Sequence, residues 1–195
     1  MARIPYADTE SASDSIRERL ERNPVSVLRI IAHAEGVFDS WRDYTDELLR
    51  KLELDPMLRE LTILQLAHLR KCEYQWVHHV ALARAVGVTA EQIAAIEDGR
   101  HDDASLSDTD REVLVFVREA VLDGEASEHA VAAVSSRLGP RQVVELLLVL
   151  GHWGAICTLI QTLALQPDLP AMAGALVDTL ALADGSIPSR PRAVD

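Results

Sequence analysis

The sequence has little of what sheet proteins, secreted disulfide proteins and nucleic-acid-binding proteins usually contain. Aromatic residues make up 4% of the 195 residues, and Cys72 and Cys157 are the two cysteines. So few aromatic residues disfavour a β-sandwich or barrel, and two thiols are too few for a secreted disulfide scaffold. The formal net charge of −12 repels phosphate backbones, so we expect no nucleic-acid partner.

Long uninterrupted apolar runs are also lacking. Residues 1–8 contain no apolar core, so we expect no signal peptide there. The most apolar stretch, residues 143–165, is interrupted by Glu145, His152 and Gln161, which favours a buried core helix over a membrane span. We therefore expect a protein of the reducing cytoplasm that has no membrane partner.

Helix-forming residues are abundant instead. The chain has 27 leucines and 26 alanines against 9 glycines and 8 prolines, a composition that favours an all-α fold. We expect one domain over residues 13–183, with flexible ends at residues 1–12 and 184–195. Turn and capping residues place the helices at residues 13–23, 25–33, 35–52, 56–70, 72–86, 89–97, 107–124, 127–138, 140–165 and 171–183.

The residues with the strongest chemical signal lie in the segment ELTILQLAHLRKCEYQWVHH, residues 60–79. If a helix begins near Cys72, then Cys72, Gln75, Trp76 and His79 share one of its faces. A thiol at a helix N-terminus is favoured as the thiolate, and a histidine two turns further on can exchange a proton with it. Glu60 lies on the preceding helix, which can fold back so that the carboxylate orients His79 or acts as a general base.

Each of these side chains also has an ordinary structural interpretation. Cys72 alone would be a small core residue, and His79 a hydrogen-bonded core histidine. Trp76 would be a packing residue, and Glu60 a solvated charge. His78 and His79 point apart on a helix, so we expect no metal site, and we expect no cofactor.

The combination resembles a known family. Glu60, together with Cys72-Glu73-Tyr74-Gln75-Trp76-Val77-His78-His79, is similar to the carboxymuconolactone decarboxylase family, which is related to the alkylhydroperoxidase D-like proteins. The spacing carries the resemblance: a glutamate twelve residues before the cysteine, an aromatic residue two after it and a histidine seven after it. The resemblance implies an alkylhydroperoxidase D-like bundle of about eight to ten helices. It also implies assembly into homotrimers or trimer-based hexamers.

One departure from the family concerns the cysteines. In the peroxidase branch of the family, the motif looks like Cys-x-x-Cys-x-x-x-His, and its second cysteine is the attacking thiol. In this sequence, Gln75 stands at the position of that second cysteine. Without that thiol, a local dithiol cycle is impossible. Cys157 is the other thiol, and the sequence alone does not place it near Cys72. This single-cysteine variant therefore resembles the decarboxylase-like side of the family.

Three functions fit this pattern, and the sequence favours the first. The first is a cofactor-independent enzyme acting on a small lactone or carboxylic acid, in which His79 donates a proton and Glu60 orients it. The second is peroxide reduction through Cys72 alone, by way of a sulfenic acid that an external thiol resolves. The third is a non-catalytic oligomeric binding module.

The remaining expectations concern the pocket and the assembly. The expected pocket residues are Tyr74, Gln75, Trp76 and His152. Tyr74 or Trp76 would donate a hydrogen bond to a developing oxyanion. Because residues 143–150 are apolar on more than one helical face, we expect the chains to associate.

Overall fold

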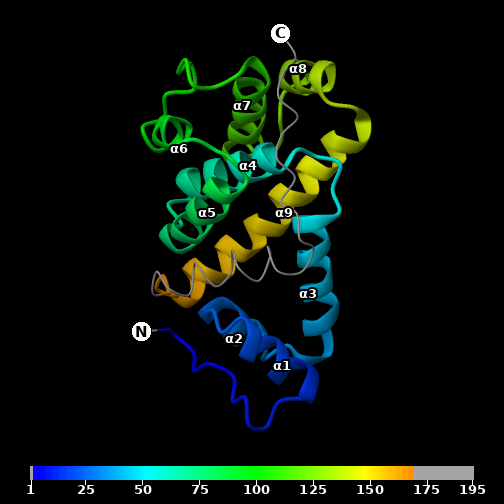
Figure 1. The fold of residues 1–195 in the computed structure, drawn as a ribbon, viewed down its shortest axis with the longest axis vertical. Coiled ribbons are helices and arrows are strands. Elements are labelled where there is room, and N and C mark those ends of the chain that lie inside the picture. The colour runs from blue at the N-terminus through cyan, green and yellow to red at the C-terminus, as the bar shows by residue number, and fades with distance from the viewer. Residues whose placement is uncertain (1, 169–195) are drawn as a thin grey trace.

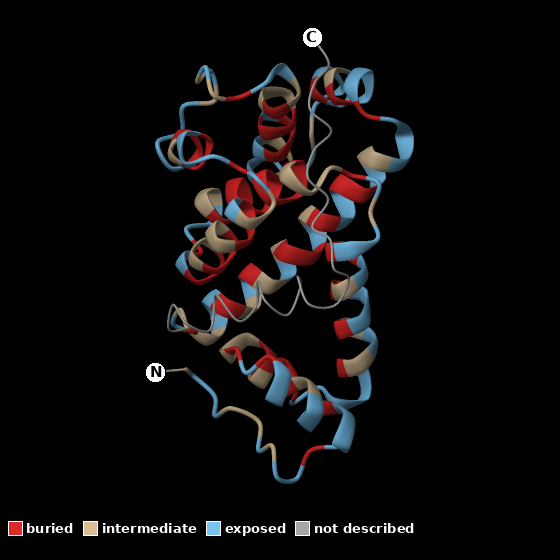
Figure 2. Cartoon of the chain, viewed as in Figure 1, coloured by how far each residue is buried: buried red, intermediate tan, exposed pale blue. Residues whose placement is uncertain are grey.

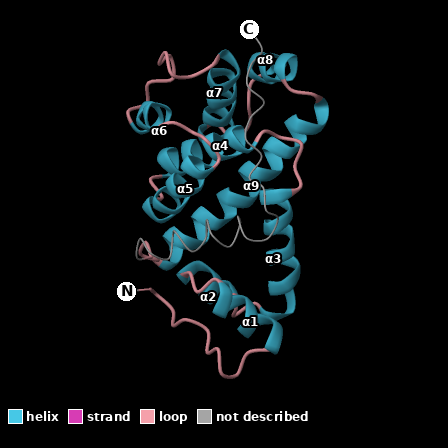
Figure 3. Cartoon of the chain, viewed as in Figure 1, coloured by secondary structure: helices cyan, strands magenta, loops and turns pink. Residues whose placement is uncertain are grey.

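The computed structural model describes residues 2–168, and this part of the chain contains helices and no strand (Figure 3). Its nine helices are α1 (Asp14–Arg22), α2 (Ser26–Ile31), α3 (Glu35–Arg50), α4 (Pro56–Arg70), α5 (Glu73–Ala85), α6 (Ala90–Glu97), α7 (Asp108–Leu122), α8 (Glu128–Arg137) and α9 (Pro140–Leu163). The predicted all-α class is confirmed. The helix expected at residues 171–183 and the tail at 184–195 lie outside the described residues.

Polar capping side chains lie at the N-termini of several of these helices, as the sequence predicts. Asp55 accepts a hydrogen bond from the backbone N–H of Met57 at 2.7 Å, and Pro56 is the first residue of α4. Thr89 and Gln92 form a reciprocal capping box at the start of α6. These side chains satisfy backbone N–H groups that the first helical turn leaves unpaired, so residues within one turn set each start.

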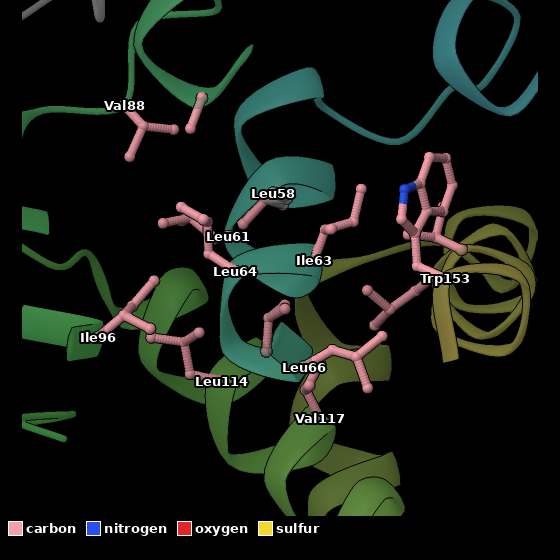
Figure 4. Packing of buried hydrophobic residues seen from close by; sticks show 14 of the residues in the cluster. Leu58, Leu61, Ile63, Leu64, Leu66, Val88, Ile96, Leu114, Val117 and Trp153 are labelled. Carbon is pink, nitrogen blue, oxygen red and sulfur yellow. The ribbon is translucent and has the colours of Figure 1, made fainter. Parts of the chain in front are cut away.

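Helix α4 lies at the centre of the upper bundle in Figure 1, packed against α5, α6, α7 and α9. Leu61, Ile96 and Leu114 lie on one side of it, and Ile63 and Trp153 on the other (Figure 4). All five side chains are buried. Burying one aliphatic side chain contributes about 1.5–3 kcal/mol, so the leucine-rich α4 supplies much of the stability of the core.

The first three helices enclose a second, smaller core. Ile16 and Leu20 of α1, Leu28 of α2 and Phe38 of α3 are buried there together. These helices present exposed outer faces in Figure 2, which fits the amphipathic pattern of α1 and α3. The two cores meet where α3, α5 and α9 approach α2, and the candidate site lies at this junction.

Residues 2–12 form no helix and lie along the molecule. The backbone N–H of Arg3 donates to the carbonyl of Leu163 at 2.9 Å, and that of Ala7 donates to the carbonyl of Arg29 at 3.0 Å. The segment therefore connects the end of α9 with α2, where the sequence suggested a flexible end.

A tight turn connects α4 to α5. Lys71 has a left-handed backbone with a φ of 53°, and the N–H of Cys72 reaches back to the carbonyl of Ala67 at 2.9 Å. This pattern closes the C-terminus of α4 and starts α5 at Glu73, with Cys72 as its N-cap residue. The turn folds α5 back along α4, which brings positions far apart in the segment 60–79 close together.

Helix α9 is long and apolar enough to span a membrane, and it is the one such helix among residues 2–168. Core helices of globular proteins can have the same length and composition. One face of it packs into the main core through Leu146, Val149 and Ile160. The opposite face exposes Leu147 and Leu148. The helix is thus a core element with an uncovered apolar face.

Candidate functional site

Glu60 and His79 meet in the core, one on α4 and one on α5. The His79 Nδ1 lies 2.8 Å from the Glu60 Oε2, and Arg59 donates from Nε to the Glu60 Oε1 at 2.9 Å. Glu60 is 0% exposed, so it is not the solvated charge of the ordinary interpretation. Burial alone would raise its pKa, but His79 and Arg59 outweigh burial and hold the pKa below the ordinary value.

Trp153 determines which ring nitrogen of His79 carries the proton. The indole Nε1–H of Trp153 donates to the His79 Nε2 at 2.8 Å. An indole nitrogen is a donor only, so the Nε2 must accept, and the proton of a neutral imidazole lies on Nδ1, facing Glu60. His79 therefore has no proton to donate outward in this arrangement. That is an obstacle to the proton-donor role expected for it.

The two cysteines lie side by side, although they are far apart in the sequence. Cys72 is at the start of α5 and Cys157 is on α9, both are buried in the same core, and each thiol is close enough to shift the pKa of the other. The neighbouring Cys157 thiol is the main reason why the pKa of Cys72 falls to about 7, and the backbone of Gln75 contributes in the same direction against the effect of burial. The Cys72 thiol and burial raise the pKa of Cys157.

A cavity of about 80 Å³ lies at the junction of the two cores, next to His79. Its polar lining residues are Asn23, Arg42, Thr45, Tyr74, Gln75, His78 and His79, and the other side chains that line it are apolar. Neither side-chain polar atom of Asn23 or of Gln75 has a hydrogen-bond partner among residues 2–168. Buried amides without partners are uncommon, so these two are free to bind a small molecule in the cavity.

A second polar cluster holds the end of the described chain against this cavity. Asp168 accepts hydrogen bonds from the backbone N–H of Ser26 at 3.0 Å and from the hydroxyl of Tyr74, and its Oδ2 lies 3.4 Å from the Nε2 of His78. Burial would raise the pKa of Asp168, but these partners hold it at about 2. Tyr74 also accepts from the backbone of Val27 at 3.2 Å, so its hydroxyl is not free to serve an oxyanion in the cavity.

Known proteins resemble this chain both in the sequence around the site and in the fold. Residues 35–106, which include Glu60, Cys72 and His79, match the carboxymuconolactone decarboxylase family. The fold is similar to that of a protein from Ralstonia eutropha JMP134, described as an alkylhydroperoxidase AhpD core and an uncharacterized peroxidase-related protein. The TM-score is 0.74 at 18% identity, covering 86% of this chain and 92% of that one. The sequence match to the carboxymuconolactone decarboxylase family thus covers residues 35–106 of the chain, and the structural match covers its fold.

Two further solved structures share this fold. An uncharacterized peroxidase-related protein from Silicibacter sp. TM1040 has a TM-score of 0.73 at 17% identity, covering 86% of this chain and 92% of that one. A protein of unknown function from Agrobacterium tumefaciens has a TM-score of 0.65 at 13% identity, covering 87% and 99%. Among curated proteins, no sequence matches. The alkylhydroperoxidase D-like fold predicted from the sequence is confirmed.

The residues that the sequence predicts for the pocket fall into two groups. Tyr74 and Gln75 line the cavity, whereas Trp76 and His152 are not part of its lining. Trp76 instead lies near His68, with ring centroids 6.3 Å apart. The geometry of α5 explains the split, because Gln75 and Trp76 are neighbours in sequence and diverge by about 100° around the helix.

His152 belongs to an aromatic cluster beside the cavity. Its Nε2 lies 2.9 Å from the hydroxyl of Thr45, and the rings of Trp41 and Tyr44 lie 5.3 and 5.2 Å from its own. Burial, followed by the nearby Arg42, lowers the pKa of His152 to about 4. His152 is therefore a neutral, hydrogen-bonded core histidine, which is the ordinary interpretation of such a residue.

Sequence reasoning missed several residues of the site. Trp153, Asp168, Asn23 and Arg42 all lie on it, and Cys157 contacts Cys72. For Cys157 one weak signal was available, because Trp153, Cys157 and Gln161 repeat at the four-residue interval of a single helix face. Trp153, Asp168 and Asn23 lie outside residues 35–106, and Arg42 lies near the start of that segment, so no local pattern identifies them.

Proposed function

We propose that this chain reduces peroxides through the thiol of Cys72. The observation that carries the proposal is the contact between Cys72 at the start of α5 and Cys157 on α9. The names of two structural relatives, which call them peroxidase-related, support the same direction. Of the functions considered for the sequence, peroxide reduction at Cys72 is thus preferred to decarboxylation.

The environment of Cys72 suits a nucleophile. A thiol with a pKa of about 7 is about half ionised at neutral pH, and the thiolate is the form that attacks a peroxide. The attack breaks the O–O bond, leaves a sulfenic acid on Cys72 and releases water or an alcohol. Because Cys72 is only 2% exposed, we expect hydrogen peroxide to react faster than a bulky organic hydroperoxide.

The test is peroxide consumption by the full chain in the presence of dithiothreitol. We expect turnover in the parent protein and none in the Cys72→Ser variant. Ser136→Ala, on an exposed part of α8, is the control and should leave the rate unchanged. Equal rates for the parent and Cys72→Ser would refute the proposal, provided that both variants have the helical content of the parent.

A second candidate function, decarboxylation of a small acid or lactone, is favoured by the cavity. The amides of Asn23 and Gln75 line it and have no hydrogen-bond partner within residues 2–168, as a site for a carbonyl or carboxyl group requires. Against it, His79 has both nitrogens engaged and offers no proton to the cavity. The Gln75→Leu variant separates the candidates, because it should abolish a cavity-based reaction and leave peroxide reduction at Cys72 in place.

We also propose that copies of the chain associate through the exposed face of α9, as homotrimers or trimer-based hexamers. Val144, Leu147 and Leu148 are 55%, 46% and 45% exposed on this face. Gly151 follows in the same stripe and allows two helices to approach closely. Three neighbouring apolar side chains at such exposure are typical of a surface that another subunit covers.

A further inference from the structure

The contact between the two thiols is fixed by the register of α9 against α4 and α5. Trp153 and Gln161 lie four residues to either side of Cys157 and share its face. The indole of Trp153 binds His79 on α5 at 2.8 Å, and the Gln161 amide donates to the carbonyl of Arg70 at 2.5 Å. These two bonds leave Cys157 opposite the start of α5, where Cys72 lies.

In this geometry the second sulfur near Cys72 belongs to Cys157 on α9, whereas the second cysteine of the peroxidase motif would lie on α5 itself. Position 75, one turn further along α5, carries glutamine, whose amide lines the cavity. Cys157 approaches Cys72 from α9 within the hydrophobic core, where both side chains are buried. A disulfide between them would tie α5 to α9, in place of a bridge within α5.

We propose that Cys157 is the resolving thiol for Cys72, and that the two form a reversible disulfide between α5 and α9. The inference rests on the proposed peroxide reduction at Cys72. Once Cys72 is a sulfenic acid, the Cys157 sulfur attacks the Cys72 sulfur, the S–S bond forms, the S–O bond breaks and water leaves with the Cys157 proton. A small external dithiol, such as dithiothreitol, then attacks the disulfide, is itself oxidised to a disulfide and returns both thiols.

The burial of the pair favours an internal partner over an external one. Cys72 is 2% and Cys157 is 0% exposed, so an external protein thiol has no direct path to a sulfenic acid at Cys72. Cys157 lies in the same buried cluster as Cys72, on the face of α9 that packs against the start of α5. The position of Cys72 assigns the roles, because the N-terminus of α5 favours its thiolate, whereas Cys157 lies well inside α9.

The test uses the full chain, a short exposure to hydrogen peroxide and peptide mapping by mass spectrometry. We expect the parent protein to lose both thiols and to yield one cross-linked peptide joining Cys72 and Cys157 within a single chain, which dithiothreitol removes. In Cys157→Ser, and in Cys157→Ala as a second variant, dimedone should instead label a sulfenic acid at Cys72. Dimedone labelling of Cys72 in the parent without a cross-link, or a cross-link between two chains, would overturn the inference while peroxide reduction stands.

A separate titration distinguishes this inference from the proposed function. Reduced parent protein is equilibrated with mixtures of reduced and oxidised dithiothreitol, which form the disulfide without peroxide. A cross-link here, combined with no reaction of Cys72 with hydrogen peroxide, would refute the proposed function and keep the reversible disulfide. Two free thiols under the most oxidising mixture would refute the disulfide, whatever the reaction with peroxide.

Discussion

Replacing Glu60 by glutamine should destabilise the protein strongly, because its carboxylate accepts from two buried neighbours. Trp153 donates to His79, His79 donates to Glu60, and Arg59 donates to Glu60 from the other side. A glutamine at position 60 has one acceptor oxygen and one donor NH₂ group. The NH₂ group would then face the N–H of either His79 or Arg59. His79 cannot relieve the conflict by moving its proton, because its Nε2–H would then face the indole N–H of Trp153.

The expected cost follows from the charge that remains. The Arg59 side chain is 7% exposed, and the carbonyl of Leu49, at 2.6 Å from its Nη1, would be its remaining partner in this network. Removing one member of a buried ion pair typically costs about 3–5 kcal/mol, because the other charge stays buried. The total free energy of unfolding of such a domain is about 5–15 kcal/mol. Glu60→Gln should therefore remove a large part of the stability and leave a fold that is only marginally stable.

Urea unfolding followed by circular dichroism measures this loss. The control is Glu128→Gln on the exposed side of α8, for which we expect a change within about 0.5 kcal/mol. Since the pKa of Glu60 is held below its ordinary value of 4.5, its contribution is complete above pH 4.5 and is lost as the pH falls through the lowered pKa. The difference between parent and variant should shrink in the same way. A loss below about 1 kcal/mol at neutral pH would refute the reasoning from the buried network.

Three further predictions concern other parts of the molecule. Cys157→Ala should raise the pKa of Cys72 above about 7, because the Cys157 thiol is the main cause of the lowering. The ultraviolet absorbance of the thiolate, followed against pH, measures this pKa. An unchanged titration would contradict the prediction. Lys71→Gly should stabilise the protein by about 1 kcal/mol in urea unfolding, since glycine adopts the left-handed conformation without strain, and a loss of stability would count against this account of the turn. Leu147→Asp, on the exposed face of α9, should shift sedimentation from an assembly to a single chain; a parent protein that is already monomeric at micromolar concentration would disprove the assembly.

The sequence predicts those parts of the fold that neighbouring residues control. Asp55 with Pro56, and Thr89 with Gln92, act within one helical turn, and the structure has a helix start at each pair. The turn around Lys71 is predictable in position but not in conformation, because lysine carries no preference for a left-handed backbone. The meeting of Glu60 with His79 depends on that turn, so the sequence could propose this contact without establishing it.

The other half of the site depends on the register of α9, which no local pattern encodes. His152 and Trp153 are adjacent, and on a helix they point about 100° apart, so only one of them can face His79. The sequence predicts His152 in the pocket, whereas the structure turns Trp153 toward His79 and His152 toward Thr45. The same rotation of α9 carries Cys157 to Cys72. One rotational setting thus accounts for both the misplaced histidine and the unexpected thiol pair.

The register of α9 also determines which groups control the reactivity of Cys72. The sequence predicts that His79 exchanges a proton with Cys72 and that Glu60 orients His79. Here the indole of Trp153 occupies the outward nitrogen of His79, and Glu60 holds the other, so the pair is built to orient and stabilise rather than to transfer a proton outward. The lowered pKa of Cys72 is due mainly to Cys157, which lies one turn beyond Trp153 on the same helix.

The Trp153→Phe variant separates the effect of His79 on Cys72 from the effect of Cys157. It should free the His79 Nε2 and leave the Cys157 thiol in place, so the thiolate titration of Cys72 should be unchanged. A Cys72 pKa that moved as far in Trp153→Phe as in Cys157→Ala would show that His79, and not the thiol pair, controls the nucleophile.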